Sequence, residues 1–184
     1  DPRYHQNALA FWPLYPSWFR GLFEKSFTEG MTDPLHGRVR ESEWRAATLA
    51  LRDSLVYCAS CGAENAVEHP DHPLVCWHCR RPVPLPLRLE LGRKTVYLNS
   101  DTHLYPWHVR LDPEFDFSRP VGAVGQNPQN PRIWGLRNCS ETPWVATLPD
   151  GTLRDVPPDR SVRLGPEVRI NFGEVEGIVR GAPE

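Results

Sequence analysis

The sequence predicts a mixed α+β protein in three parts, and three observations support this prediction. Apolar residues recur at helical spacing in residues 1–56, four cysteines gather in residues 57–86, and short alternating runs fill residues 87–184. These patterns are typical of a helical segment, a small metal-stabilised module and an all-β sandwich or barrel. A chain of 184 residues is long enough to be divided in this way.

Two helices are predicted within residues 1–56. The stretch SWFRGLFEKSFTEGM carries apolar residues one, three and four positions apart, which favours a helix over 17–31 with one buried face. The stretch ESEWRAATLALRDSLVY repeats that spacing and adds alanines, so a second helix is predicted over 42–56. The first stripe consists of Trp18, Phe19, Leu22, Phe23, Phe27 and Met31. The two helices are expected to pack through Trp18, Leu22, Phe23, Phe27, Trp44, Leu51 and Leu55.

The cysteine region contains two C-x-x-C pairs, Cys58 with Cys61 and Cys76 with Cys79. Each pair places two thiolates on one tight turn, and two such turns complete a tetrahedral sulfur site of the kind that favours zinc. One structural Zn²⁺ on these four cysteines is therefore expected, with no open position for catalysis. An iron–sulfur cluster is the alternative metal centre. Three nearby histidines could compete as ligands: His69, His72 and His78.

Two further residues bear on the cysteine chemistry. Gly62 follows the second thiolate, where such a turn often needs a positive φ angle. Cys139 stands apart from the pairs, in a segment with no histidine base close in sequence. We therefore expect Cys139 to be a small, partly buried residue and not a nucleophile.

The last part of the chain changes to strand-like patterns. Short runs of alternating apolar and polar residues are separated by turn signals such as PDG, PPD and LGP. The runs cover residues 87–92, 94–99, 108–111, 143–148, 161–164, 167–173 and 176–180. This spacing predicts an all-β sandwich or barrel of about 100 residues.

Composition removes several classes of protein. Lys and Arg number 21 against 23 Asp and Glu, so no global charge favours nucleic acid or membrane surfaces. No stretch approaches the 18 apolar residues of a membrane span. The first residues lack the basic and apolar regions of a signal peptide, so a reducing, cytoplasmic location is expected.

The stretch LFEKSFTEGMTDPLHGRVRESEW resembles the end of the C-lobe of eukaryotic-like Ser/Thr protein kinases. In that family a helix with an aromatic stripe precedes a D-P-x-x-R-P turn and a helix that opens with E-W. The matching residues are Asp33, Pro34, Arg38, Glu43 and Trp44, and Val39 replaces the usual proline. None of the kinase catalytic motifs is present in the sequence, so the resemblance implies a non-catalytic region of such a kinase.

The remaining sequence resembles one bacterial arrangement, in which the kinase domain precedes a four-cysteine zinc ribbon and a forkhead-associated (FHA)-like β-sandwich. The matching stretches are TVYLNSDTHLYPWHV (95–109), VGAVGQNPQNPRIWGLRN (121–138) and WVATLPDGTLRDVPPDRSVRLGPEVRINFG (144–173). Kinases of this type are associated with a von Willebrand A-type protein and a metal-dependent protein phosphatase, in loci linked to tellurite and stress resistance. The resemblance implies a zinc-stabilised docking module with these proteins as partners.

The sequence departs from phosphothreonine-binding FHA domains, which use G-R on one loop and S-x-x-H on the next. Here VGAVGQNP offers no G-R, and no histidine follows Ser140 at the required spacing. Binding that does not depend on phosphate is therefore expected. The candidate contact residues are Trp134, Trp107, Arg132 and Arg137, and Trp144 is expected in the core.

Two other functions were weighed against docking. A zinc-ribbon nucleic-acid-binding protein would use a basic and aromatic patch formed by Trp77, Arg80, Arg81, Arg88, Arg93 and Lys94. Acidic residues in the same ribbon and the net charge of −2 make that function less favourable. An enzyme would draw on Asp101, His103 and His108, which are expected instead to be polar residues of an extended segment between strands.

Overall fold

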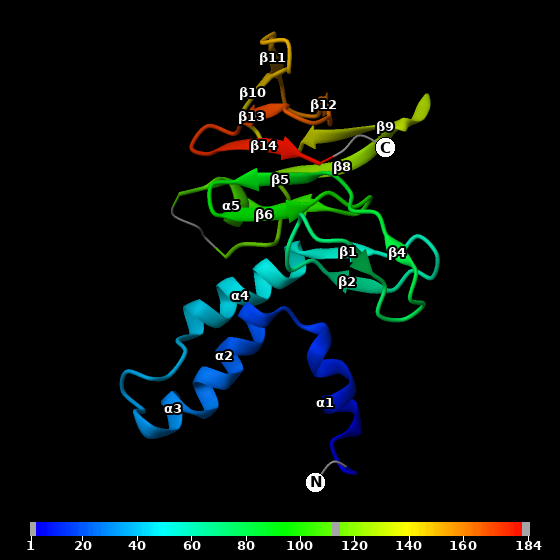
Figure 1. Cartoon of the computed structure of the whole chain (residues 1–184). Coiled ribbons are helices and arrows are strands. Elements are labelled where there is room, and N and C mark those ends of the chain that lie inside the picture. Colours follow the sequence, from blue (N-terminus) through cyan, green and yellow to red (C-terminus); the bar gives the residue numbers. More distant parts are fainter. Residues whose placement is uncertain (1–2, 112–114, 182–184) are drawn as a thin grey trace. The chain divides into compact units, whose positions relative to one another are not determined.

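The computed structural model describes residues 3–111 and 115–181. The chain divides into two compact units, Asp1–Leu85 and Pro86–Glu184. The first unit combines helices with two small sheets, and the second consists mostly of antiparallel strands (Figure 1). The prediction of a helical N-terminal part, a cysteine cluster and a largely antiparallel remainder is confirmed at this level.

The first unit opens with five helical elements. They are α1 (Gln6–Phe11), the 3-10 turn η1 (Trp12–Leu14), α2 (Ser17–Phe27), α3 (Glu29–Thr32) and α4 (Glu41–Asp53). The single helix predicted over 17–31 is wrong, because the backbone leaves the helical region at Thr28 (φ −117°, ψ −80°). The chain from α3 to α4 then folds closely on itself: a Cβ added to Gly37 would lie 2.4 Å from the Glu29 carbonyl oxygen. Only glycine fits at that position.

The second predicted helix also ends earlier than expected. Helix α4 begins at Glu41, where the Glu43 carboxylate accepts a hydrogen bond from the Arg40 backbone N–H at 2.7 Å. It stops at Asp53, and β1 (Leu55–Tyr57) continues the chain as a strand. Val56 is fully buried there. The helical pattern of apolar residues up to 56 was misleading because tertiary pairing with β2 (Glu64–Ala66) determines the conformation of these residues.

Helices α2 and α4 lie side by side (Figure 1), and they pack through a small aromatic cluster. The Phe23 and Trp44 ring centroids lie 4.6 Å apart, and Phe19, 6% exposed, lies 6.2 Å from Trp44. The pairing through Phe23 and Trp44 is thus confirmed. Other predicted core residues are wrong: Trp18 is 39% exposed and Phe27 69% exposed, because Phe19 instead occupies the contact. Met31 of the stripe and Leu35 after it are exposed as well.

The cysteine region contributes the two small antiparallel sheets of the first unit. One pairs β1 with β2, and the other pairs β3 (Leu74–Val75) with β4 (Pro82–Val83). Each sheet is a short ladder that carries one C-x-x-C turn at its end.

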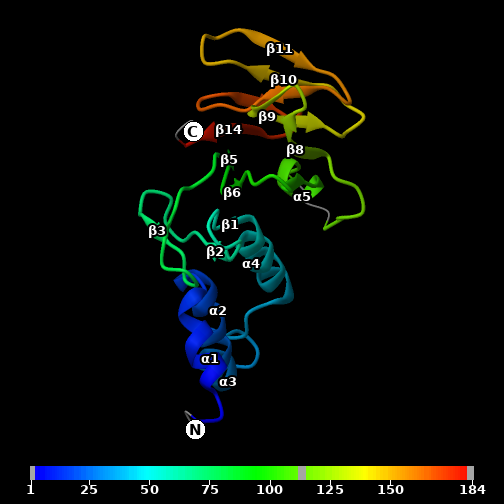
Figure 2. The same ribbon diagram turned by 90° about the vertical axis from the view of Figure 1, so that its right-hand side faces the viewer.

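The second unit contains two antiparallel sheets. The six-stranded sheet has the order β11-β10-β13-β14-β5-β6, and the four-stranded sheet has the order β12-β9-β8-β7. The strands and short helix are β5 (Arg88–Leu91), β6 (Lys94–Tyr97), β7 (His103–Leu104), α5 (Pro106–Val109), β8 (Gly122–Asn127), β9 (Asn130–Asn138), β10 (Trp144–Thr147), β11 (Leu153–Val156), β12 (Ser161–Arg163), β13 (Arg169–Asn171) and β14 (Glu176–Arg180). The first and last strands, β5 and β14, lie side by side, and the β10–β11 hairpin forms the far edge (Figure 2).

The residues that the two sheets bury form one hydrophobic cluster. Strand alternation turns Leu136 and Val162 of one sheet, and Ile170 and Val179 of the other, into this cluster, and all four are 0% exposed. Trp144 is 2% exposed, as predicted, and its ring meets Phe172 edge to face at 4.8 Å. Burying side chains of this size stabilises the unit by roughly 1.5–3 kcal/mol each.

Most predicted strands are present, but one is wrong, and the β8–β9 hairpin and strands β7 and β11 were missed. Residues 108–111 were predicted as a strand, yet His108 and Val109 lie in α5, which Pro106 initiates. The hairpin of β8 and β9 was not predicted as strands. Its glycines and prolines lack strand propensity, and pairing across the hairpin outweighs that weak local preference.

Candidate metal centre

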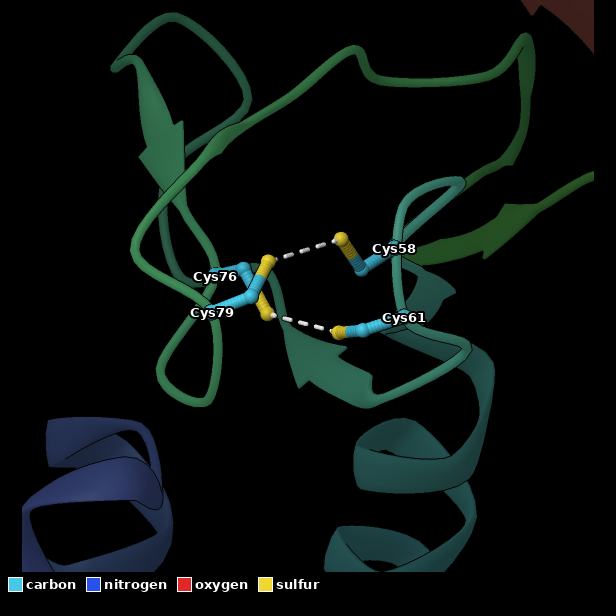
Figure 3. Close-up of side chains that lie close together, drawn as sticks. All are labelled: Cys58, Cys61, Cys76 and Cys79. Carbon is cyan, nitrogen blue, oxygen red and sulfur yellow. Dashed lines mark hydrogen bonds between the residues drawn. The ribbon is translucent and has the colours of Figure 1, made fainter.

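The four cysteines of the two C-x-x-C pairs come together in the first unit, where they form a cluster that could hold a metal ion. Figure 3 shows their side chains pointing toward one another from two separate turns. Cys58 and Cys61 follow β1, and Cys76 and Cys79 lie between β3 and β4. Two of the four, Cys58 and Cys76, are buried.

Both turns use the same backbone hydrogen bonds. In the first, the Gly62 N–H donates to the Cys58 carbonyl at 2.8 Å, and the Cys58 N–H donates to the Ala63 carbonyl at 2.9 Å. In the second, the Arg80 N–H donates to the Cys76 carbonyl at 3.0 Å, and the Cys76 N–H donates to the Arg81 carbonyl at 2.8 Å. The two halves of the site are thus structural equivalents.

The residue four positions after the first cysteine has a positive φ angle in both turns. Gly62 adopts φ +75°, as predicted, and Arg80 adopts φ +60°. A non-glycine residue in this region is uncommon, and it persists where the surrounding structure fixes it. No sequence pattern indicated the positive φ angle of Arg80.

The sulfur atoms are spaced for shared coordination and not for disulfides. The Sγ atoms of Cys58 and Cys79 are 3.6 Å apart, as are those of Cys61 and Cys76 (dashed lines in Figure 3). A disulfide would require about 2.05 Å. All four sulfur atoms lie within 4.8 Å of one another, so one ion at their centre could reach each of them.

The close spacing of the four thiols separates their pKa values. Burial raises the pKa of Cys76, but the backbone N–H groups of Cys79 and His78 and the neighbouring thiols lower it to about 6. The Ala63 N–H lowers the pKa of Cys61, but desolvation and the three other thiols raise it to about 12. Interacting acids separate in this way because each thiolate disfavours the next. A divalent cation would remove that penalty, since a coordinated thiol is deprotonated.

A polar contact behind the sulfur atoms joins the two turns. Asn65 on β2 is 4% exposed, and its side-chain N–H donates to the Ala63 carbonyl at 2.8 Å while its oxygen accepts the Trp77 backbone N–H at 3.1 Å. The Trp77 indole N–H donates to the Glu64 carbonyl at 2.8 Å. Sequence reasoning missed Asn65, whose side chain holds the second cysteine turn against strand β2.

Comparison of the chain with protein-family models, with curated proteins and with solved structures gave no match. No helix in the part of the chain that the structure describes is long and apolar enough to cross a membrane.

The predicted contact residues of the second unit lie in different environments. Trp107 is wrong as a surface contact: it is 8% exposed, stacks on Phe115 at 5.0 Å and has the Lys94 ammonium 4.3 Å from its ring centroid. Trp134 on β9 is half-buried against the core cluster, so part of its ring is accessible. Arg132 and Arg137 are exposed on the same strand, but Arg132 lies in the irregular part of the hairpin, between the paired residues Asn130 and Trp134, and Arg137 lies in the regular part.

The loop between β9 and β10 is held by its own polar groups. Asn138 is fully buried and donates from its side chain to the Thr142 and Val156 carbonyls at 2.8 and 2.9 Å. Its oxygen accepts the Ser140 hydroxyl at 2.7 Å. Ser140 is therefore engaged within the loop. Cys139 is partly buried, as expected.

Several residues of the two alternative functions have partners within the second unit. Arg88 pairs with Glu90 at 3.0 Å, and the Lys94 ammonium donates to the Trp107 carbonyl. These two members of the basic patch are engaged within the second unit. His103 lies in an extended segment as expected, but on strand β7 and not between strands. The extended segment is wrong for His108, which is fully buried in α5.

Proposed function

We propose that this chain is a non-catalytic docking and regulatory region of a bacterial Ser/Thr protein kinase, stabilised by one structural zinc ion. The observation that carries the proposal is the cluster of four cysteines. Four protein ligands fill a tetrahedral site and leave no position for water or substrate. A centre of this kind holds a fold together and leaves recognition to the surrounding surface.

Zinc is the ion that the thiol geometry favours. A tetrahedral Zn²⁺ with bonds of about 2.3 Å separates its sulfur ligands by about 3.8 Å. The two Sγ distances of 3.6 Å are close to that value. Elemental analysis should find one zinc per chain, bound by Cys58, Cys61, Cys76 and Cys79. A coloured preparation containing iron, or a folded preparation without metal, would contradict this assignment.

The helical segment supports the origin in a kinase. Arg38 follows Pro34 after three residues, one more than in the kinase turn. It forms no ion pair within residues 3–111 and 115–181, and its kinase counterpart pairs with a glutamate that lies upstream. Trp18 near the start of α2, and Phe27 and Met31 in the residues before this turn, expose apolar surface. A preceding kinase lobe would cover such a surface.

The two-sheet unit supports an FHA-like sandwich as the docking part. Its two antiparallel sheets share one hydrophobic cluster. The stretch VGAVGQNP carries no G-R, and no histidine follows Ser140 at the S-x-x-H spacing; the G-R at 92–93 and the S-x-x-H at 100–103 lie outside these two stretches. Ser140 is engaged by Asn138. A phosphate with nearly two negative charges needs several convergent donors to offset its lost hydration. Binding is therefore proposed to be independent of phosphate.

Calorimetric titration tests the docking function. The zinc-loaded chain would be titrated with the von Willebrand A-type protein, with the metal-dependent phosphatase and with a phosphothreonine peptide library. We expect micromolar or tighter binding to one of the two proteins and none to the peptides. Binding to a phosphopeptide that disappears on dephosphorylation would overturn phosphate independence. Absence of binding to both proteins would overturn these partners.

A further inference from the structure

The two sheets of the second unit differ in whether their arginines form ion pairs. On the six-stranded sheet, three arginines are paired with carboxylates. Arg88 lies 3.0 Å from Glu90, Arg169 lies 3.7 Å from Glu176, and Arg180 lies 3.6 Å from Glu90. These pairs neutralise much of the charge that this sheet presents.

The four-stranded sheet carries cations without partners. Its strands contain Arg132, Arg137 and Arg163, together with His103, and no Asp or Glu. None of the three arginines forms an ion pair with any described residue, and all three are exposed. The sheet therefore presents positive charge only.

Strand register places two of these arginines next to each other on the outward face. Leu136 and Val162 point into the core, so Arg137 and Arg163, which alternate with them, point away from it. Arg137 is paired with Ser161, and Arg163 with Gly135, on adjacent strands. The two arginines are thus diagonal neighbours, within reach of one ligand.

The residues beside Arg137 and Arg163 on the outward face have small side chains. On β8, Ala123 is paired with Arg137, and Gly125 is paired with Gly135. A Cβ added to Gly125 would meet no atom within 4 Å. Small side chains therefore leave room for a chain to lie across the strands beside the two guanidinium groups.

We propose that this outward face, formed by Arg137, Arg163, Ala123, Gly125 and Gly135, binds an acidic segment of a protein partner. Planar guanidinium groups bind carboxylates through paired hydrogen bonds, and two adjacent arginines suit consecutive acidic side chains of one segment. Nucleic acid is less suited, because tight phosphate binding uses six to ten contacts and this face offers few cations. The proposal deepens the docking function and rests on it.

The test uses the zinc-loaded full chain and a fluorescein-labelled peptide of alternating glutamate and serine, followed by fluorescence anisotropy. The double substitution Arg137→Glu with Arg163→Glu should weaken binding about tenfold or more. The matched control, Arg154→Glu with Arg169→Glu, changes net charge equally on the six-stranded sheet and should shift affinity by less than about twofold. Zinc content and circular dichroism would verify that both variants are folded.

Three outcomes would overturn the proposal. They are absence of peptide binding by the unsubstituted chain, equal losses in the two double variants, and tighter binding of a single-stranded oligonucleotide than of the peptide. Titration of the von Willebrand A-type protein and of the phosphatase distinguishes failure of this proposal from failure of the docking function. If one of them binds the unsubstituted chain and the Arg137 and Arg163 variant equally well, docking stands and this face is not its site.

Discussion

The two units of this chain are stabilised by different interactions: the second by a hydrophobic core, the first in part by its cysteine cluster. The second unit buries a continuous cluster that reaches from Leu89 near its start to Val179 near its end. The first unit buries few apolar residues, and two of them, Cys58 and Cys76, belong to the cysteine cluster itself. Small modules rarely bury enough apolar surface to fold alone, and a metal ion supplies what the core lacks. The comparison implies that the units depend on different interactions and should respond separately to substitution.

The largest expected effect follows from removing one ligand of the cysteine cluster. Cys76→Ser should abolish stoichiometric zinc and unfold residues 55–83, while the second unit stays folded. Structural zinc contributes about 10–16 kcal/mol of apparent binding free energy in zinc-finger peptides, far more than one side-chain contact. Hydrogen–deuterium exchange resolved to peptides would show loss of protection in the first unit alone.

Cys139 supplies the control for this experiment. It is partly buried in the second unit and lies outside the cysteine cluster, so Cys139→Ser should leave zinc content and exchange unchanged. Equal loss of protection in both units after Cys76→Ser would contradict the separation of the two units. Full protection of residues 55–83 without zinc would contradict a structural role for the metal.

The second effect addresses the other half of the comparison. Trp144 is 2% exposed, its ring meets Phe172, and its edge packs where Gly122 leaves room. Trp144→Ala should destabilise the second unit by about 3–5 kcal/mol because it leaves a large cavity in the core. Urea denaturation with exchange as readout should locate the loss in the second unit, with zinc retained. Trp144→Phe should lose less, and a loss of zinc in either variant would contradict independence.

The sequence was informative where the determinants are local. Two C-x-x-C pairs need only a tight turn each, so the ligands and the positive φ of Gly62 followed from spacing alone. Phe23 and Trp44 likewise followed from helical periodicity. The candidate metal centre was therefore predictable as a set of residues, although its supporting contacts were not.

The sequence was uninformative where distant segments decide the conformation. Leu55–Tyr57 carries a helical pattern but pairs with β2 as a strand, and Val56 is buried by that pairing. Strands β5 and β14 are paired although nearly the whole unit separates them in sequence. The positive φ of Arg80 and the polar bridge of Asn65 depend on the folded turns, and side-chain type alone did not indicate them.

A smaller effect is expected from the contact that joins the two cysteine turns. Asn65→Ala would leave the half-buried Trp77 backbone N–H without its acceptor, and a group left unsatisfied costs about 1–3 kcal/mol where it is fully buried, so we expect a loss at the lower end. Because outer contacts orient metal ligands, zinc affinity should also fall by about tenfold or more. Competition with a chromophoric chelator would measure this change. Asn99→Ala, in the second unit, is the control, and an equal loss of zinc affinity there would contradict the assignment.

The smallest expected effect concerns the junction of the helices and the cysteine region within the first unit. Helix α2 begins after Pro16, whose side chain has no atom that could accept a capping hydrogen bond. The Glu68 carboxylate supplies this function from a distance, because it accepts the Ser17 hydroxyl and, at 3.0 Å, the Ser17 backbone N–H. The first of these hydrogen bonds is the main cause that lowers the pKa of Glu68 below its ordinary value of 4.5.

The direction of the pH dependence follows from that lowered pKa. The stabilisation by Glu68 is present above the ordinary glutamate pKa and is lost as pH falls through the lowered pKa of the folded state. Glu68→Gln removes the charge at the helix N-terminus, and because the group is largely solvated it should cost only about 0.5 kcal/mol near neutral pH. Exchange of the α2 amides should therefore quicken slightly in the variant at pH 7, and the difference should vanish in acid. Glu24→Gln, on the same helix but away from its start, should show no such difference. If Glu24→Gln quickens exchange of the α2 amides equally, the effect is caused by the change in net charge and not by the loss of the Glu68 cap.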